Sequence, residues 1–157
     1  MSDPQGSTYR NQFGVRTTGA TSLNDWRRLS QMLNVRGNAL CGLHHWAEAV
    51  ASFRDCARLA WECLALHELA FVLWNLPRAL AHVREPERAL QLAGFAEAFW
   101  ATRFGEFSGA DRHDLRRVRR LAGVQLGARR VDASPIEQLW AQGAQLPLAE
   151  AMALALR

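Results

Sequence analysis

The sequence contains no lysine, because all 19 of its cationic side chains are arginine. A G-x-x-x-x-G-K-[ST] phosphate loop is therefore impossible, which excludes a Walker A nucleotide site in this chain. Only three cysteines are present, at positions 41, 56 and 63, and no two of them form a C-x-x-C pair. A disulfide framework is not indicated, and the thiols fit a reducing compartment.

Signals for secretion and for membrane insertion are also missing. Residues 1–21 are rich in Ser, Thr, Gly, Gln and Asn and lack the apolar run of a signal peptide. We expect them to form a flexible tail, because this composition buries too little surface to offset the entropy of ordering. The most apolar stretch, residues 59–81, contains Glu62, His67 and Arg78, which a membrane span would exclude. The sequence therefore predicts a cytoplasmic protein with no membrane association.

Helical periodicity fills the rest of the chain, and no segment alternates apolar and polar side chains as a half-buried strand does. At 157 residues and 49% hydrophobic content, the chain has room for one domain with its own core. Apolar side chains recur at three- and four-residue steps in about seven segments. We predict an all-α domain over residues 22–157, built as an array of antiparallel helical hairpins.

Several helix boundaries follow from local signals. We expect the first helix to stop near Gly42 in a left-handed conformation, since glycine adopts it at low cost. A third helix is expected over roughly 59–83, with Pro77 kinking or interrupting it. Asp111, with Asp114 three residues later, is expected to open the fifth helix.

Two segments offset by forty residues carry a similar order of large and small side chains. In the first, Gly37 and Ala49 allow two helices to approach closely, while Leu33, Leu40 and Phe53 fill the seam. The second uses Leu73, Leu80, Ala89, Ala93 and Ala96, with Pro77 where a small residue belongs. The pattern resembles tetratricopeptide repeats, which implies an α-α superhelix with Gly37 packed against the second helix.

The order of motifs from Trp46 onward carries a wider resemblance. It runs through Glu85-Pro86-Glu87-Arg88-Ala89, Leu92-Ala93-Gly94-Phe95-Ala96-Glu97 and Leu148-Ala149-Glu150-Ala151. This order resembles the C-terminal helical repeats of bacterial signal-transduction ATPases and LuxR-type transcriptional regulators. The resemblance implies a non-catalytic recognition module in bacterial signalling or transcription control. Binding of a ligand or partner would then act on an upstream ATPase or DNA-binding module.

The same resemblance places one side of the first helix on a concave groove. Gln31, Asn34 and Asn38 follow one another along that side, and Trp74 and Arg78 lie forty residues after Asn34 and Asn38. Amide side chains beside an aromatic ring and an arginine suit an extended peptide or its carboxylate. We therefore expect a protein or peptide partner bound by these five residues.

A basic segment supports a different interpretation. The net charge is +4, the pI is near 9.7, and Arg112, Arg116, Arg117 and Arg120 gather on one helix. These arginines are alternative nucleic-acid contacts, because phosphate attraction is largely independent of sequence. The charge excess is small, so the composition favours a protein partner over nucleic acid.

Metal binding and catalysis have weaker support. Cys41 with His45, and Cys63 with His67, stand four residues apart on one helical face and are candidate zinc ligands. Cysteine at core positions is more simply a small apolar residue, so we expect no metal and no cofactor. No motif sets a nucleophile beside a base and an orienting acid, so we expect no enzymatic activity.

Overall fold

The computed structural model describes residues 8–10, 16–18, 22–106, 108–127 and 134–157. The described residues form seven helices, which confirms the predicted all-α class and the array of hairpins. The helices are α1 (Ser22–Gly42), α2 (Trp46–Glu62), α3 (Leu66–His82), α4 (Pro86–Phe104), α5 (Gly109–Gln125), α6 (Ser134–Ala144) and α7 (Leu148–Leu156).

Two short strands precede the helical domain. Thr8–Arg10 (β1) pairs antiparallel with Arg16–Thr18 (β2), and Thr8 lies opposite Thr18. Sequence periodicity did not predict them, since three residues are too few to show alternation. The rest of the segment 1–21, which we expected to be a flexible tail, lies outside the residues that the structure describes.

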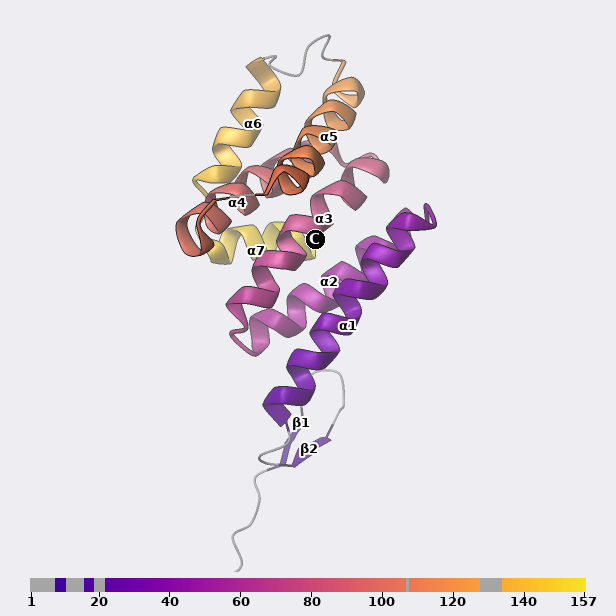
Figure 1. Cartoon of the computed structure of the whole chain (residues 1–157), viewed down its shortest axis with the longest axis vertical. Coiled ribbons are helices and arrows are strands. Elements are labelled where there is room, and N and C mark those ends of the chain that lie inside the picture. The colour runs from indigo at the N-terminus through magenta and orange to yellow at the C-terminus, as the bar shows by residue number, and fades with distance from the viewer. Residues whose placement is uncertain (1–7, 11–15, 19–21, 107, 128–133) are drawn as a thin grey trace, which may run out of the picture.

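Helices α1 to α4 stack in sequence order, each antiparallel to the next (Figure 1). Helix α5 lies against α3 and α4, α6 lies against α4, and α7 contacts α2 and α4. In Figure 1, α5 and α6 occupy the end of the molecule remote from β1 and β2. One continuous core, contributed by all seven helices, runs through this stack.

The first four helices are joined by three turns of the same geometry. Their central residues, His44, Leu64 and Arg84, recur every 20 residues and have φ of 62°, 52° and 64°. In each turn the next N–H bonds the carbonyl five residues back, as from His45 to Leu40 at 2.9 Å. This is the hydrogen-bond pattern of a Schellman motif, which satisfies the carbonyls at the helix end. The regular turn fixes the antiparallel course of each helix pair.

The turns correct two of the predicted boundaries. Helix α1 does end at Gly42, but the left-handed residue is His44, so glycine is not used for its conformational freedom there. The stretch 59–83 is not one helix, because the turn around Leu64 separates α2 from α3. Apolar side chains continue on both sides of that turn, so the sequence shows no polar break.

Two other local features differ from the expectations. Pro77 does not interrupt α3, and its side chain is fully buried, so packing outweighs the loss of one backbone donor. Helix α5 begins at Gly109, before Asp111, and its cap is Ser108. The Ser108 hydroxyl accepts from the Asp111 N–H at 3.3 Å, and Asp111 accepts from the Ser108 N–H at 3.2 Å. Asp111 thus completes a capping box as its third residue.

Close helix crossings depend on three glycines. A Cβ on Gly37 would lie closer than 3.0 Å to ring carbons of Phe53, which confirms that Gly37 packs on α2. On the far side of the stack, a Cβ on Gly94 would meet the Trp140 carbonyl. A Cβ on Gly143 would meet the Gln91 carbonyl in the same way. Helices α4 and α6 therefore touch backbone to backbone, with a glycine on each side.

The Gly37 crossing gives a direct stability test. We expect Gly37→Ala to lower the free energy of unfolding by about 1–3 kcal/mol, because the new methyl group overlaps the buried Phe53 ring. Gly42→Ala is the matched control, since nothing lies within 4 Å of its Cβ. It should leave stability unchanged or raise it by up to about 1 kcal/mol. Urea unfolding measures both; equal stability of the two variants would contradict the crossing.

Candidate binding groove

Polar side chains join α1 to α3 along one side of the stack. Glu68 is 6% exposed, and its Oε1 accepts from the Arg27 Nε at 2.8 Å and from the Gln31 Nε2 at 3.3 Å. A buried carboxylate requires such partners, because desolvating an unpaired charge costs several kcal/mol. The predicted groove residue Gln31 is thus engaged with a residue of α3 that the sequence reasoning did not single out.

Asn34 is held in the same way. Its Oδ1 accepts from the Asn75 Nδ2 at 3.1 Å, and both side chains are half-buried. Asn38, one turn further along α1, is exposed. Two of the three predicted amides therefore align α1 on α3, and Asn38 is the one presented to solvent.

Beyond Asn38, a pocket opens between the end of α1, the start of α2, the end of α3 and the middle of α5. Its cavity is about 210 Å³. We call it the basic pocket; it is lined by Cys41, Gly42, His44, Trp46, Arg78, Ala81, His82, Arg117, Val118 and Leu121. Two arginines and two histidines face it, and within the described part of the chain no Asp or Glu is among its lining residues. Such a cavity suits an anionic group.

An aromatic stack forms one wall of the basic pocket. The Trp46 and His82 rings lie parallel, with centroids 3.6 Å apart and an interplanar angle of 3°. The Arg78 guanidinium carbon lies 5.8 Å from the centroid of the Trp46 ring. Burial lowers the pKa of His82, and the nearby Arg78, His44 and Arg117 lower it further. The lowered pKa favours the neutral imidazole, and Arg78 and Arg117 contribute positive charge to the pocket.

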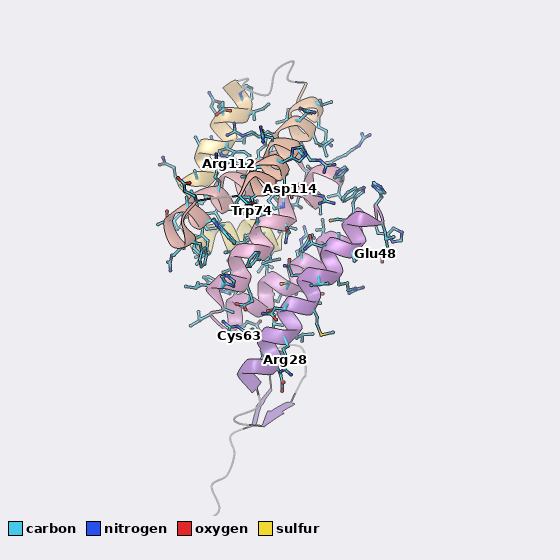
Figure 2. The ribbon with its side chains drawn as sticks, viewed as in Figure 1. Arg28, Glu48, Cys63, Trp74, Arg112 and Asp114 are labelled. Atoms are coloured by element: carbon cyan, nitrogen blue, oxygen red, sulfur yellow. The ribbon has the colours of Figure 1, made fainter. Side chains whose placement is uncertain are left out.

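Trp74 belongs to a separate aromatic cluster. Its ring lies 5.8 Å from that of Trp100, which in turn contacts Phe71 and Phe104 at 5.0 Å each. Figure 2 shows Trp74 near the middle of the ribbon. The structure thus brings Arg78 into the basic pocket but places Trp74 among the aromatic side chains of α3 and α4.

The arginines of α5 are divided between two sides of the helix. Arg117 lines the basic pocket, whereas Arg112 and Arg116 line a cleft that faces α4 and α6. In that cleft the Arg119 guanidinium lies 4.0 Å from the Trp140 ring centroid and pairs with Glu137 at 2.9 Å. Arg120 is exposed. The four predicted nucleic-acid contacts therefore do not converge on one pocket.

The thiols are poorly suited to nucleophilic chemistry. Burial raises the pKa of Cys56 to about 12, with the Glu68 carboxylate acting in the same direction. Burial also raises the pKa of Cys41 and Cys63. The thiolate is the reactive form, so the raised pKa lowers the nucleophilic reactivity of each thiol at neutral pH.

The structure does not bring the candidate zinc ligands Cys41, His45 and His67 together in one site. In the part of the chain that the structure describes, no three His, Cys, Asp or Glu side chains gather in a way that suits a metal ion. Cys41 lines the basic pocket, whereas His45 pairs with Glu48 at 2.9 Å on the surface. His67 contacts the Phe71 ring at 4.8 Å.

Comparisons with known proteins are negative: no family model, no curated protein and no solved structure matches this chain. Of the helices described, none combines the length and the apolar character needed to cross a membrane.

Sequence reasoning did not bring three residues of the basic pocket together. Arg117 was predicted as an alternative nucleic-acid contact, whereas Trp46 and His82 were given no binding role. A signal existed for His82, since it follows Arg78 by four residues and so shares its helical face. Nothing in the sequence places Trp46 or Arg117 beside them, because they come from other helices.

Thiol labelling checks the burial of Cys56. We expect iodoacetamide at about pH 8 to modify Cys56 only as the chain unfolds, because its pKa of about 12 leaves almost no thiolate. Mass spectrometry of digests would follow the reaction, with all three cysteines reacting in denaturant as the control. Modification of native Cys56 at the rate seen in denaturant would contradict its burial.

Proposed function

We propose that this chain is a non-catalytic recognition module that binds an acidic segment of a protein partner. A carboxylate of that segment occupies the basic pocket, between Arg78 of α3 and Arg117 of α5. The segment continues over α1 past Asn38. The observation that carries the proposal is a cavity of about 210 Å³ with two arginines and an aromatic wall in it.

The chemistry of the pocket supports this ligand class. Arginine donates several N–H groups in a planar fork that matches a carboxylate. The Trp46–His82 stack gives the ligand an apolar surface beside the charges. The basic pocket contains one thiol, Cys41, and its raised pKa disfavours the nucleophilic thiolate. Binding without chemistry is the function that these side chains support best.

The biological setting is part of the proposal and depends on the resemblance alone. Repeats of this kind suggest bacterial signalling or transcription control, in the cytoplasm. The partner segment would then report to an ATPase or DNA-binding module of a larger regulator.

Charge neutralisation in the pocket tests the proposal. We expect Arg117→Gln or Arg78→Gln to weaken binding of a labelled peptide of alternating Glu and Ser by about tenfold, because each removes a charge-assisted contact. Fluorescence anisotropy would measure binding, and the Gln–Ser twin peptide should not bind. Arg116→Gln is the matched control on the same helix, because Arg116 lines the opposite cleft. Equal losses for Arg116→Gln and Arg117→Gln would contradict the pocket.

His82 makes the affinity depend on pH. A bound carboxylate favours the imidazolium, so we expect the peptide to bind several-fold more tightly at about pH 5.5 than at about pH 7.5. His82→Gln should reduce this difference, and His82→Gln with His44→Gln should remove it, because both histidines line the pocket. In the free chain the lowered pKa has the opposite effect: the unfolded state takes up the proton first, so stability falls as pH drops below about 6.5. Binding titrations and urea unfolding at both pH values check the two signs.

The alternative function is nucleic-acid association through Arg112, Arg116, Arg117 and Arg120. Its support is that the side chains of all four arginines are exposed on α5. Duplex DNA at low salt separates the two functions, because phosphate-driven binding weakens steeply as salt rises. Salt-sensitive binding of DNA that Arg116→Gln and Arg117→Gln weaken alike would favour this alternative.

A further inference from the structure

The positive charge of the basic pocket has no counter-charge in the described chain. Arg78 of α3 and Arg117 of α5 line the pocket, and among the described residues neither takes part in a salt bridge. No Asp or Glu is among the lining residues in that part of the chain. Two guanidinium groups at the cavity therefore keep their charge and their N–H donors available to a ligand.

Two imidazoles add donors to the same cavity. His44, in the turn between α1 and α2, and His82, at the end of α3, both line the pocket. The charges of Arg78, His44 and Arg117 all act on the pKa of His82, so the four side chains lie within electrostatic reach of one another. An anion held among them would favour both imidazolium forms. The pocket thus offers four donor-bearing side chains from three segments of the chain.

This set of charges matches a dianion better than a single carboxylate. One carboxylate carries one negative charge, so it leaves one of the two arginines without a partner. A phosphoserine carries a charge of about −1.5 to −2 at pH 7 and has three strong acceptor oxygens. Because these oxygens surround one phosphorus atom, a single phosphoryl group can accept from two guanidinium groups and an imidazole together.

The size of the cavity favours one compact group. Two neighbouring carboxylates would also supply two negative charges, but they belong to two side chains that must both enter a cavity of about 210 Å³. A phosphoryl group delivers the same charge on one short side chain. Clusters of arginine are a recurring means of recognising phosphorylated segments for this reason.

We propose that the basic pocket binds the phosphoryl group of a phosphoserine in the partner segment. The inference rests on the proposed function, because it uses the same pocket and the same course of the segment past Asn38. The phosphoryl group takes the place of the carboxylate, with the same sign and a higher charge. Phosphorylation of the partner would then strengthen its binding to this chain.

Four labelled peptides test the ligand class, all on the background of alternating Gln and Ser. One carries a single phosphoserine at its centre, one carries two adjacent Glu residues there, one carries a single Glu, and one is unmodified. At about pH 7.5 the phosphate is almost entirely a dianion, so the first two peptides have the same charge. We expect the phosphoserine peptide to bind about tenfold more tightly than the peptide with two Glu residues in anisotropy titrations. The unmodified peptide should not bind.

Substitutions in the pocket test which side chains read the phosphoryl group. Arg78→Gln and Arg117→Gln should each weaken binding of the phosphoserine peptide by about tenfold or more and remove most of its preference over the peptide with two Glu residues. Arg116→Gln, on the opposite side of α5, should change neither the affinity nor the preference. Urea unfolding of each variant checks that the fold is kept; Arg117 is exposed and Arg78 is half-buried.

The outcomes separate this inference from the proposed function. Equal binding of the phosphoserine peptide and the peptide with two Glu residues would overturn the inference alone, because charge without a phosphoryl group would then suffice. No binding of these peptides or of the Glu–Ser peptide would overturn both. Free O-phosphoserine should compete only at about tenfold higher concentration or more than the phosphoserine peptide, since it lacks the segment over α1. Equal competition would overturn the assignment to a protein segment and make a small phosphomonoester the ligand.

Discussion

The structure depends on how closely its paired helices approach one another. Where α1 crosses α2, the Phe53 ring packs directly against Gly37, and a Cβ at position 37 would overlap the ring. Where α4 crosses α6, Gly94 and Gly143 let the two backbones touch. Protein interiors are close-packed and have no space for an added methyl group. Each crossing therefore fixes the positions of the helices that pack next to it.

The repeated turn converts those crossings into an array. His44, Leu64 and Arg84 adopt a left-handed conformation at 20-residue intervals, each at a modest cost in free energy because none is glycine. The Schellman hydrogen bonds offset part of that cost. The outcome is that α1 and α3 lie side by side with the same orientation, joined by Glu68 and its partners. The polar side chains between α1 and α3, such as Gln31 and Asn34, therefore hold these two helices together.

The basic pocket lies where the end of α1, the start of α2, the end of α3 and the middle of α5 meet. Arg78 and Arg117 face one cavity although they are far apart in sequence, and no salt bridge to either is found among the described residues. Both arginines would attract an anion in this cavity, as the proposed function requires.

Sequence alone determined the helical class, the array of helical hairpins and the Gly37 crossing. These follow from local periodicity and from the size of single side chains, which neighbours far along the chain do not alter. Helix ends were harder to predict from the sequence. The left-handed residue of the turn at position 64 is a leucine, so neither a glycine nor a polar residue marks the turn. Only the tertiary structure decided which polar groups meet. The angles at which helices pack placed Arg117 with Arg78, turned Arg112 and Arg116 to another side, and gave Gln31 to a buried carboxylate. Those angles depend on all the contacts of the core at once, and no short stretch of sequence contains them.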